Sequence, residues 1–324
     1  QANGGLGAEV HGAVQAARRA FVDDDGSRSA RARAEHPVGR HDDARIRMDS
    51  VLVEARRRGT PWIAAAALHD LGNLAYEQGD MAAADRHWEF AAAVYDSMSE
   101  PPSAINARIN RAHALVRLER HDDAKALLEK LIRDGTRIED QAPRIVAVAE
   151  LGRLMRHMGR HAQAERLLRQ ARFESEGEEV QTTDFATIEL AGVLSATGRA
   201  AEAEAVLDSL LPPTRLASIT HDDHAAIWYE RSVARRARGR LPEALVAARE
   251  AERLARRPTG RASIYWLDAA VEVGRCHRAL GQPDSAVAIL GRAARAWERW
   301  RAEISDLEWR ERAASGLSGL FAEY

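Results

Sequence analysis

The sequence predicts an all-α fold, a solenoid of about six to seven stacked helical hairpins. Its main support is a repeated motif, Gly-x-x-x-x-Ala or a near copy, with successive copies 39 to 42 residues apart. A fixed period near 40 is typical of an array of identical supersecondary units. No segment shows the alternating apolar and β-branched pattern of a strand. The copies of the motif end at Ala44, Ala84, Ala124, Ala164, Ala203, Ala244 and Ala286.

One unit shows why each element should form. Apolar residues in Ala65–Gln78 recur at helical spacing, which predicts the first helix of a hairpin. Gly79 allows the left-handed conformation that ends a helix. Asp80 then serves as N-cap of a second helix over Met81–Ser97. In that second helix Ala84 is small enough to let the two helices approach closely.

The other units follow the same logic and define three parts of the chain. Residues 1–24 hold an N-terminal tail with one weak helix, and residues 25–300 form the solenoid. The solenoid has six clear hairpins after a degenerate first unit that includes residues 23–40. Residues 301–324 form a C-terminal helix whose apolar stripe lacks a C-cap, so we expect it to lead into or dock a further domain.

Composition narrows the classes of function. The 324 residues carry 47 basic and 49 acidic side chains, so the net charge of -2 gives no sign of binding to nucleic acid or to an anionic membrane. No apolar stretch is long enough to span a bilayer. A single cysteine, Cys276, excludes an internal disulfide and fits a reducing compartment. We therefore expect a cytoplasmic protein without a cofactor.

The repeat resembles the tetratricopeptide repeat family. One unit carries Leu71-Gly72-Asn73, Tyr76, Ala84, Trp88 and Ala91 at that family's spacings, and later units carry Leu151-Gly152 and Gly274. The period near 40 departs from the usual 34 and implies longer helices or turns. The resemblance implies a right-handed superhelix that binds a protein or peptide on its concave face.

In that family the first helix of each repeat lines the concave groove. Because arginine and histidine are frequent at these positions, we expect the ligand to be an acidic peptide or the acidic face of a partner. The alternative is that they are ordinary exposed arginines of an arginine-rich chain. Asn73 and Asn110 match two positions of a chaperone-tail carboxylate clamp. That interpretation is rejected, since Val146 and Glu150 stand where basic residues are needed. The expected groove residues are His69, Asn73, Tyr76, Asn106, His113, Arg117, Arg153, Arg156, His157, Tyr229, Arg236, Arg275 and Arg278.

The C-terminal part has a further resemblance. Residues 292–304 and the pattern over residues 317–324 look like the junction that joins a tetratricopeptide array to a caspase-like protease in bacterial CHAT-domain proteins. This likeness implies the sensor region of a signalling or defence protein. The alternative is the ligand- or peptide-sensing array of a bacterial transcriptional regulator. Trp297, Trp300 and Trp309 either pack the terminal helices or form a docking face.

Candidate chemistry within the chain has a structural explanation in each case. Cys276 and His277 are adjacent, but neighbouring helical residues point about 100° apart, so we expect a buried cysteine rather than a nucleophile. The His-Asp-Asp strings that begin at His41, His121 and His221 suit helix N-termini through capping and the helix dipole. Copies one repeat apart lie too far from each other to share a metal ion. We expect no enzyme and no metal site in this chain.

Overall fold

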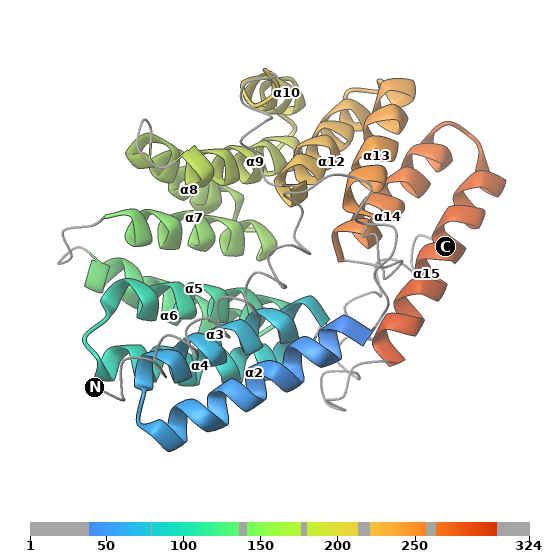
Figure 1. Cartoon of the computed structure of the whole chain (residues 1–324). Coiled ribbons are helices and arrows are strands. Elements are labelled where there is room, and N and C mark those ends of the chain that lie inside the picture. Colours follow the sequence, from blue (N-terminus) through green and yellow to red (C-terminus); the bar gives the residue numbers. More distant parts are fainter. Residues whose placement is uncertain are drawn as a thin grey trace. The chain divides into compact units, whose positions relative to one another are not determined.

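The computed structural model describes residues 39–302 except 79, 136–140, 176–179, 213–220 and 257–263. Within these residues every regular element is an α-helix, which confirms the predicted fold class (Figure 1). The helices form antiparallel pairs in series after α2 (Gly39–Arg58). The pairs are α3 (Pro61–Gln78) with α4 (Met81–Ser97), α5 (Pro101–Arg117) with α6 (His121–Gly135), α7 (Ala142–His157) with α8 (His161–Ser175), α9 (Val180–Ala196) with α10 (Ala200–Asp208), α12 (His221–Ala237) with α13 (Leu241–Ala255), and α14 (Ile264–Ala279) with α15 (Pro283–Ala302).

The described residues belong to two compact units, which divide within α6 between Leu127 and Leu128. The first unit contains α2 to the start of α6. The second contains the rest of α6 to α15. Each unit is a stack in which the second helix of one hairpin packs on the first helix of the next, as α4 does on α5 and α8 does on α9. A hairpin buries its apolar face only when its neighbour is present.

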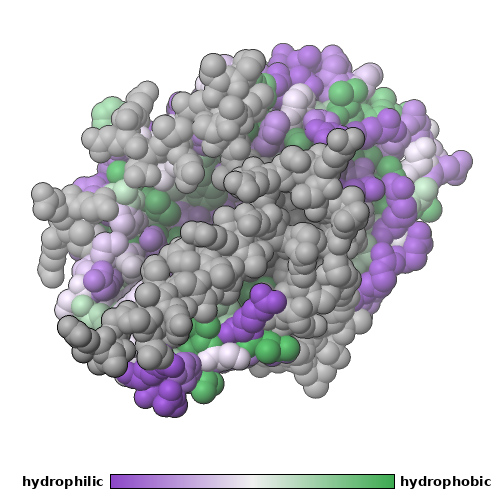
Figure 2. Space-filling model, viewed as in Figure 1, coloured by the Kyte–Doolittle hydropathy of each residue, from purple (hydrophilic) through white to green (hydrophobic). Residues whose placement is uncertain are grey.

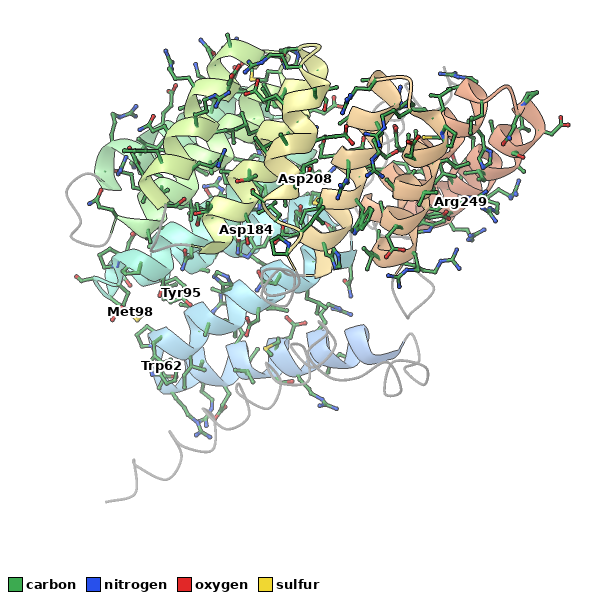
Figure 3. All side chains as sticks on the ribbon, turned by 90° about the horizontal axis from the view of Figure 1, so that it is seen from above. Trp62, Tyr95, Met98, Asp184, Asp208 and Arg249 are labelled. Atoms are coloured by element: carbon green, nitrogen blue, oxygen red, sulfur yellow. The ribbon has the colours of Figure 1, made fainter. Side chains whose placement is uncertain are left out.

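The hairpin of α3 and α4 forms for the reasons that the sequence suggests. The backbone N–H of Ala83 donates to the Asp80 carboxylate at 2.9 Å, so Asp80 is the N-cap of α4 as predicted. Helix α3 begins at Pro61, four residues before the predicted start at Ala65. Proline at the first helical position costs no hydrogen bond, which explains the earlier start. Trp62, Tyr95 and Met98 lie toward the same end of this hairpin (Figure 3).

Left-handed residues close the tight turns inside most of the hairpins. The backbone is left-handed at Gly159, Gly198, Gly239 and Gly281, where φ is 71°, 80°, 72° and 69°. Glu119 takes the same conformation with φ of 58°, although it has a side chain. The turn at Gly79 lies outside the described residues. The geometry of the turn is therefore the same with glycine and without it.

Small residues allow the helices of each hairpin to approach. The motif alanines from Ala84 to Ala244 are fully buried, and Ala286 is nearly so. A Cβ at Gly152 would lie 2.7 Å from the Leu168 side chain, and one at Gly274 would lie 2.8 Å from Leu290. The recurring glycine and alanine positions thus mark the two sides of one helix crossing.

Among the described helices, none combines the length and the apolar character that spanning a bilayer demands. Where the described residues are visible, Figure 2 shows hydrophilic residues interspersed with hydrophobic ones. On α2, Ile46 and Val53 are exposed. Several predicted features lie outside the described residues: the N-terminal helix, the degenerate unit before residue 39, and the C-terminal segment from residue 303 with Trp309. The side chain of Trp300 is also outside them, whereas Trp297 is buried on α15.

Candidate functional site

The predicted groove residues lie on the first helices of the hairpins. The first unit carries His69, Asn73, Tyr76, Asn106, His113 and Arg117 on α3 and α5. The second unit carries Arg153, Arg156, His157, Tyr229, Arg236, Arg275 and Arg278 on α7, α12 and α14. Asn106, His157 and Arg278 are exposed, and the others are half-buried. Because the two units are separate bodies, each set is described by itself.

The first unit holds a polar network of amides and an imidazole. The Asn73 side-chain oxygen accepts from the Trp88 indole N–H at 3.2 Å and from the Asn110 amide at 3.5 Å. The same Asn110 amide nitrogen lies 3.2 Å from Nε2 of His69. Tyr76 packs against Trp88 with ring centroids 5.7 Å apart. These contacts fix the orientation of the amides on α3 and α5.

Helix α5 extends this network along one face. Asn106, Asn110, His113 and Arg117 follow each other at spacings of four, three and four residues, which places them on the same side of the helix. Asn110 was recognised in the sequence only as part of the rejected clamp. The structure instead places it at the centre of the polar network.

In the second unit Arg156 bridges three hairpins. Its Nη1 donates to Glu189 of α9 at 2.8 Å, and its Nη2 donates to Oε1 of Glu230 on α12. The guanidinium passes over α9 at Gly192, where a Cβ would lie 1.9 Å from its central carbon. Gly192 therefore leaves the space through which Arg156 reaches α12.

Three other predicted arginines of the second unit also have carboxylate partners. Arg153 pairs with Glu150 at 2.8 Å and lies over the Phe185 ring. Arg236 donates to Glu272 at 2.7 Å, and Arg275 lies 3.6 Å from the same carboxylate. Glu272 is fully buried. These arginines thus neutralise the second unit's own carboxylates.

The four partner glutamates form a repeated set that was missed in the sequence. Glu150, Glu189, Glu230 and Glu272 each stand nine residues before the turn glycine of their hairpin. Their spacings of 39, 41 and 42 residues match the repeat period. The recurring glutamates were therefore visible in the sequence. Charged residues are rarely buried without a partner, however, and the partners could not be identified from the sequence.

Burial and neighbouring charges shift the pKa of the cluster around Glu230. Burial raises the pKa of Glu230 above its usual value, and Glu189 and Glu272 raise it further, while Arg156 opposes them. Burial alone would lower the pKa of Arg156, but Glu230 and Glu189 raise it, so the guanidinium stays charged. Burial also raises the pKa of Tyr229, with Asp268 the next largest cause. The cluster combines two carboxylates with one permanent cation.

The candidate chemistry at Cys276 has the predicted structural explanation. Cys276 is fully buried in α14, and burial raises the pKa of its thiol to about 11. His277 contacts Gln282 at 2.7 Å instead of the cysteine sulfur. Among the described residues no group of three or more metal-ligating side chains comes together. The side chains of His41, His221 and Asp222 lie outside them.

Three segments of the sequence match a known protein family. The model of a family described as tetratricopeptide repeat matches residues 105–130, 145–170 and 185–209. These segments cover parts of α5–α6, α7–α8 and α9–α10, which follow one another along the chain. The chain carries tetratricopeptide repeats. No protein of curated function matches the sequence.

Several solved structures share the fold of these tetratricopeptide repeats. The apo form of the quorum sensor NprR from B. thuringiensis has a TM-score of 0.60 at 13% identity, over 79% of this chain and 71% of that one. A Rap protein complexed with Competence and Sporulation Factor has a TM-score of 0.52 at 14% identity, over 97% and 89%. A tetratricopeptide repeat protein from Parabacteroides merdae ATCC 43184 has a TM-score of 0.51 at 15% identity, over 94% and 97%. At these identities the likeness concerns the fold.

Proposed function

We propose that the chain is a recognition scaffold that binds a peptide or an extended protein segment along the first helices of its repeats. The observation that carries the proposal is the polar network of α3 and α5. It joins Asn73 of α3 to Asn110 of α5, and Asn106 lies one turn before Asn110 on the same side of α5. The fold itself is one that binds other polypeptides far more often than it catalyses a reaction, so no enzymatic activity is proposed.

Amide side chains suit the main chain of an extended peptide. Each carries a donor and an acceptor, as does each peptide unit of the ligand. Contacts between Asn73, Trp88 and Asn110 fix the amides before a ligand arrives, which lowers the entropy lost on binding. Asn106 is exposed and extends the row toward solvent. This arrangement recognises a backbone with little dependence on its sequence.

Two of the structural neighbours support a sensor role. NprR is described as a quorum sensor, and the Rap protein was solved with Competence and Sporulation Factor. We propose by analogy that this chain senses a peptide in the cytoplasm and regulates an attached or associated protein. The resemblance of residues 292–304 to the CHAT junction favours a protease as that protein. A DNA-binding segment in the full gene would favour the transcriptional regulator instead.

The acidic partner predicted from the sequence rests on the arginines of the second unit. Arg156, Arg236 and Arg275 are paired with carboxylates of the chain itself, which weakens the support for an acidic partner. The peptide main chain, recognised by the first unit, is therefore the better-supported feature of the ligand.

Selection from a random peptide library on the immobilised full chain tests the proposal. We expect enriched peptides whose binding falls at least about ten-fold when both Asn106→Ala and Asn110→Ala are introduced, since two hydrogen-bonding groups are lost. Gln163→Ala is the matched control, because this exposed amide lies on α8, a second helix. Enrichment that is equal for the chain and the double variant would overturn the assignment to α3 and α5.

A further inference from the structure

The cluster of Arg156, Glu189 and Glu230 is short of one positive charge. Two carboxylates share a single guanidinium, which uses Nη1 for Glu189 and Nη2 for Glu230. Glu230 is only 3% exposed, and its second oxygen, Oε2, has no hydrogen-bond partner. A buried carboxylate oxygen without a donor is costly and uncommon. It therefore points to a donor that the protein itself does not provide.

The surroundings of this oxygen favour a cation. Tyr229 precedes Glu230 on α12, and burial, followed by the charges of Asp268, Glu230 and Glu272, raises the pKa of its hydroxyl. An aromatic ring beside carboxylates is the environment that an ammonium or guanidinium group prefers. An anion placed here would instead face Glu189, Glu230 and Asp268. The arginines nearby are already bound to carboxylates and leave little positive potential for it.

The cluster can be approached from solvent. The side chain of Glu189 keeps 14% of its surface exposed and that of Arg156 keeps 23%. Asp268 is exposed, and Tyr229 is half-buried. A long, flexible side chain with a charged tip can therefore reach Glu189 from solvent, whereas Oε2 of Glu230 is itself buried.

We propose that the second unit holds a subsite for the guanidinium of an arginine side chain of a peptide, bound between Glu189 and Glu230. A guanidinium has several donors in one plane, so it can satisfy Oε2 of Glu230 and share Glu189 with Arg156. The cluster then contains two cations and two carboxylates. This inference rests on the proposed function, because it assumes that the ligand is a peptide, and adds the class of side chain that is recognised.

A proton is the alternative source of the missing charge, and the two sources are distinguishable. Without ligand, the charges facing Glu230 are Arg156 of α7, Glu189 of α9 and Glu272 of α14, and burial is the largest cause that raises the pKa of its carboxyl. A guanidinium beside this carboxyl favours its ionised form and so lowers its pKa when the ligand binds. Binding should therefore release a proton and become tighter as the pH rises.

The test compares three capped heptapeptide pools with random flanks and a fixed central residue. That residue is arginine, its neutral isostere citrulline, or glutamate. By fluorescence anisotropy on the full chain we expect the arginine pool to bind about ten-fold more tightly than the citrulline pool. Calorimetry in two buffers of different ionisation enthalpy should show proton release with the arginine pool alone.

Variants link the preference to the cluster. Glu189→Gln should remove most of the preference for arginine, and its partly exposed position makes it the safer change for folding. Asp208→Asn is the matched control: Asp208, labelled in Figure 3, is an exposed acid on α10 that pairs with Arg231. It should leave the preference unchanged, and circular dichroism should show equal folding for both variants.

The outcomes separate the subsite from the proposed function. Equal binding of the arginine and citrulline pools, a preference for glutamate, or an unchanged preference in Glu189→Gln would each overturn the subsite and leave peptide binding in place. Absence of binding by all three pools would overturn both.

Discussion

At the scale of single residues, the turns of the hairpins require one residue in the left-handed conformation. Gly159 and Glu119 occupy equivalent turns and both have positive φ, of 71° and 58°. An L-residue in this conformation is strained by roughly 1–2 kcal/mol, because its Cβ approaches the following carbonyl oxygen. The turn between α5 and α6 therefore forms although its sequence offers no glycine at this position.

This strain predicts that Glu119→Gly stabilises the protein by about 1 kcal/mol, after the greater chain entropy of glycine in the unfolded state is subtracted. Gly159→Ala should destabilise it by a similar amount, although a Cβ there meets no atom within 4 Å. Urea unfolding followed by circular dichroism measures both. A neutral Glu119→Gly would show that the turn relaxes around the glutamate.

The buried Glu230 predicts a dependence of stability on pH. Its pKa in the folded chain is raised above the ordinary value, chiefly by burial, so folding favours its protonated form. The stability that this group contributes is complete below the unfolded pKa and is lost as the pH rises through the folded pKa. Glu230→Gln, which mimics the protonated acid, should remove this loss.

The free energy of unfolding should be measured for both chains from pH 5 upward. The difference between Glu230→Gln and the parent should shift in favour of the variant as the pH increases. A difference that stays constant with pH would contradict the prediction. Comparing the two chains cancels the opposite trend of carboxylates such as Glu165 and Glu202, whose pKa values are lowered chiefly by hydrogen bonds from Arg199.

At the scale of helices, two effects oppose each other at Gly192, where the Arg156 side chain crosses α9: the helix propensity of the residue and the space that it leaves for the guanidinium. Glycine inside a helix costs about 1 kcal/mol relative to alanine, so sequence alone suggests that Gly192→Ala stabilises α9. The structure predicts the reverse, because a Cβ at Gly192 would overlap the guanidinium of Arg156. Displacing this group would leave Glu189 and Glu230 without their shared cation.

We therefore expect Gly192→Ala to destabilise the chain by about 1–3 kcal/mol, the usual cost of overpacking. A double-mutant cycle with Arg156→Ala isolates the cause. In the Arg156→Ala background, Gly192→Ala should become neutral or stabilising. If both backgrounds lose the same stability, the effect comes from α9 itself and the interpretation is wrong.

The hairpins were predictable from the sequence, and the pairing of their charges was not. Met81–Ser97 and its Asp80 cap depend on neighbouring residues, so local reasoning was sufficient. Arg156 and Glu230, by contrast, are 74 residues apart and meet only because α7, α9 and α12 stack. The arginines could be placed on the first helices, but whether they face a ligand or a carboxylate depends on those long-range contacts. The brevity of α10, nine residues long, was also not predicted.

At the scale of the whole chain, the repeat period continues unchanged across the boundary between two compact units. The spacing of the motif stays near 40 through Ala124, yet the described residues separate into two compact units within α6. Repeat arrays derive their stability from each hairpin and its contacts with adjacent hairpins, so cooperativity need not extend along the full chain. The polar network of α3 and α5 and the cluster around Glu230 belong to different units.

This division predicts that the two units lose protection from hydrogen exchange separately. Gly274→Val places a side chain where even a Cβ would lie 2.8 Å from Leu290, and it should destabilise the second unit by about 2 kcal/mol. Exchange monitored by mass spectrometry should then accelerate in α12 to α15 and remain unchanged in α3 and α4. Gly72→Val, which would meet Trp88, should produce the reciprocal pattern. If either substitution accelerates exchange equally in both units, the chain unfolds as one cooperative body, and the two units share one stability.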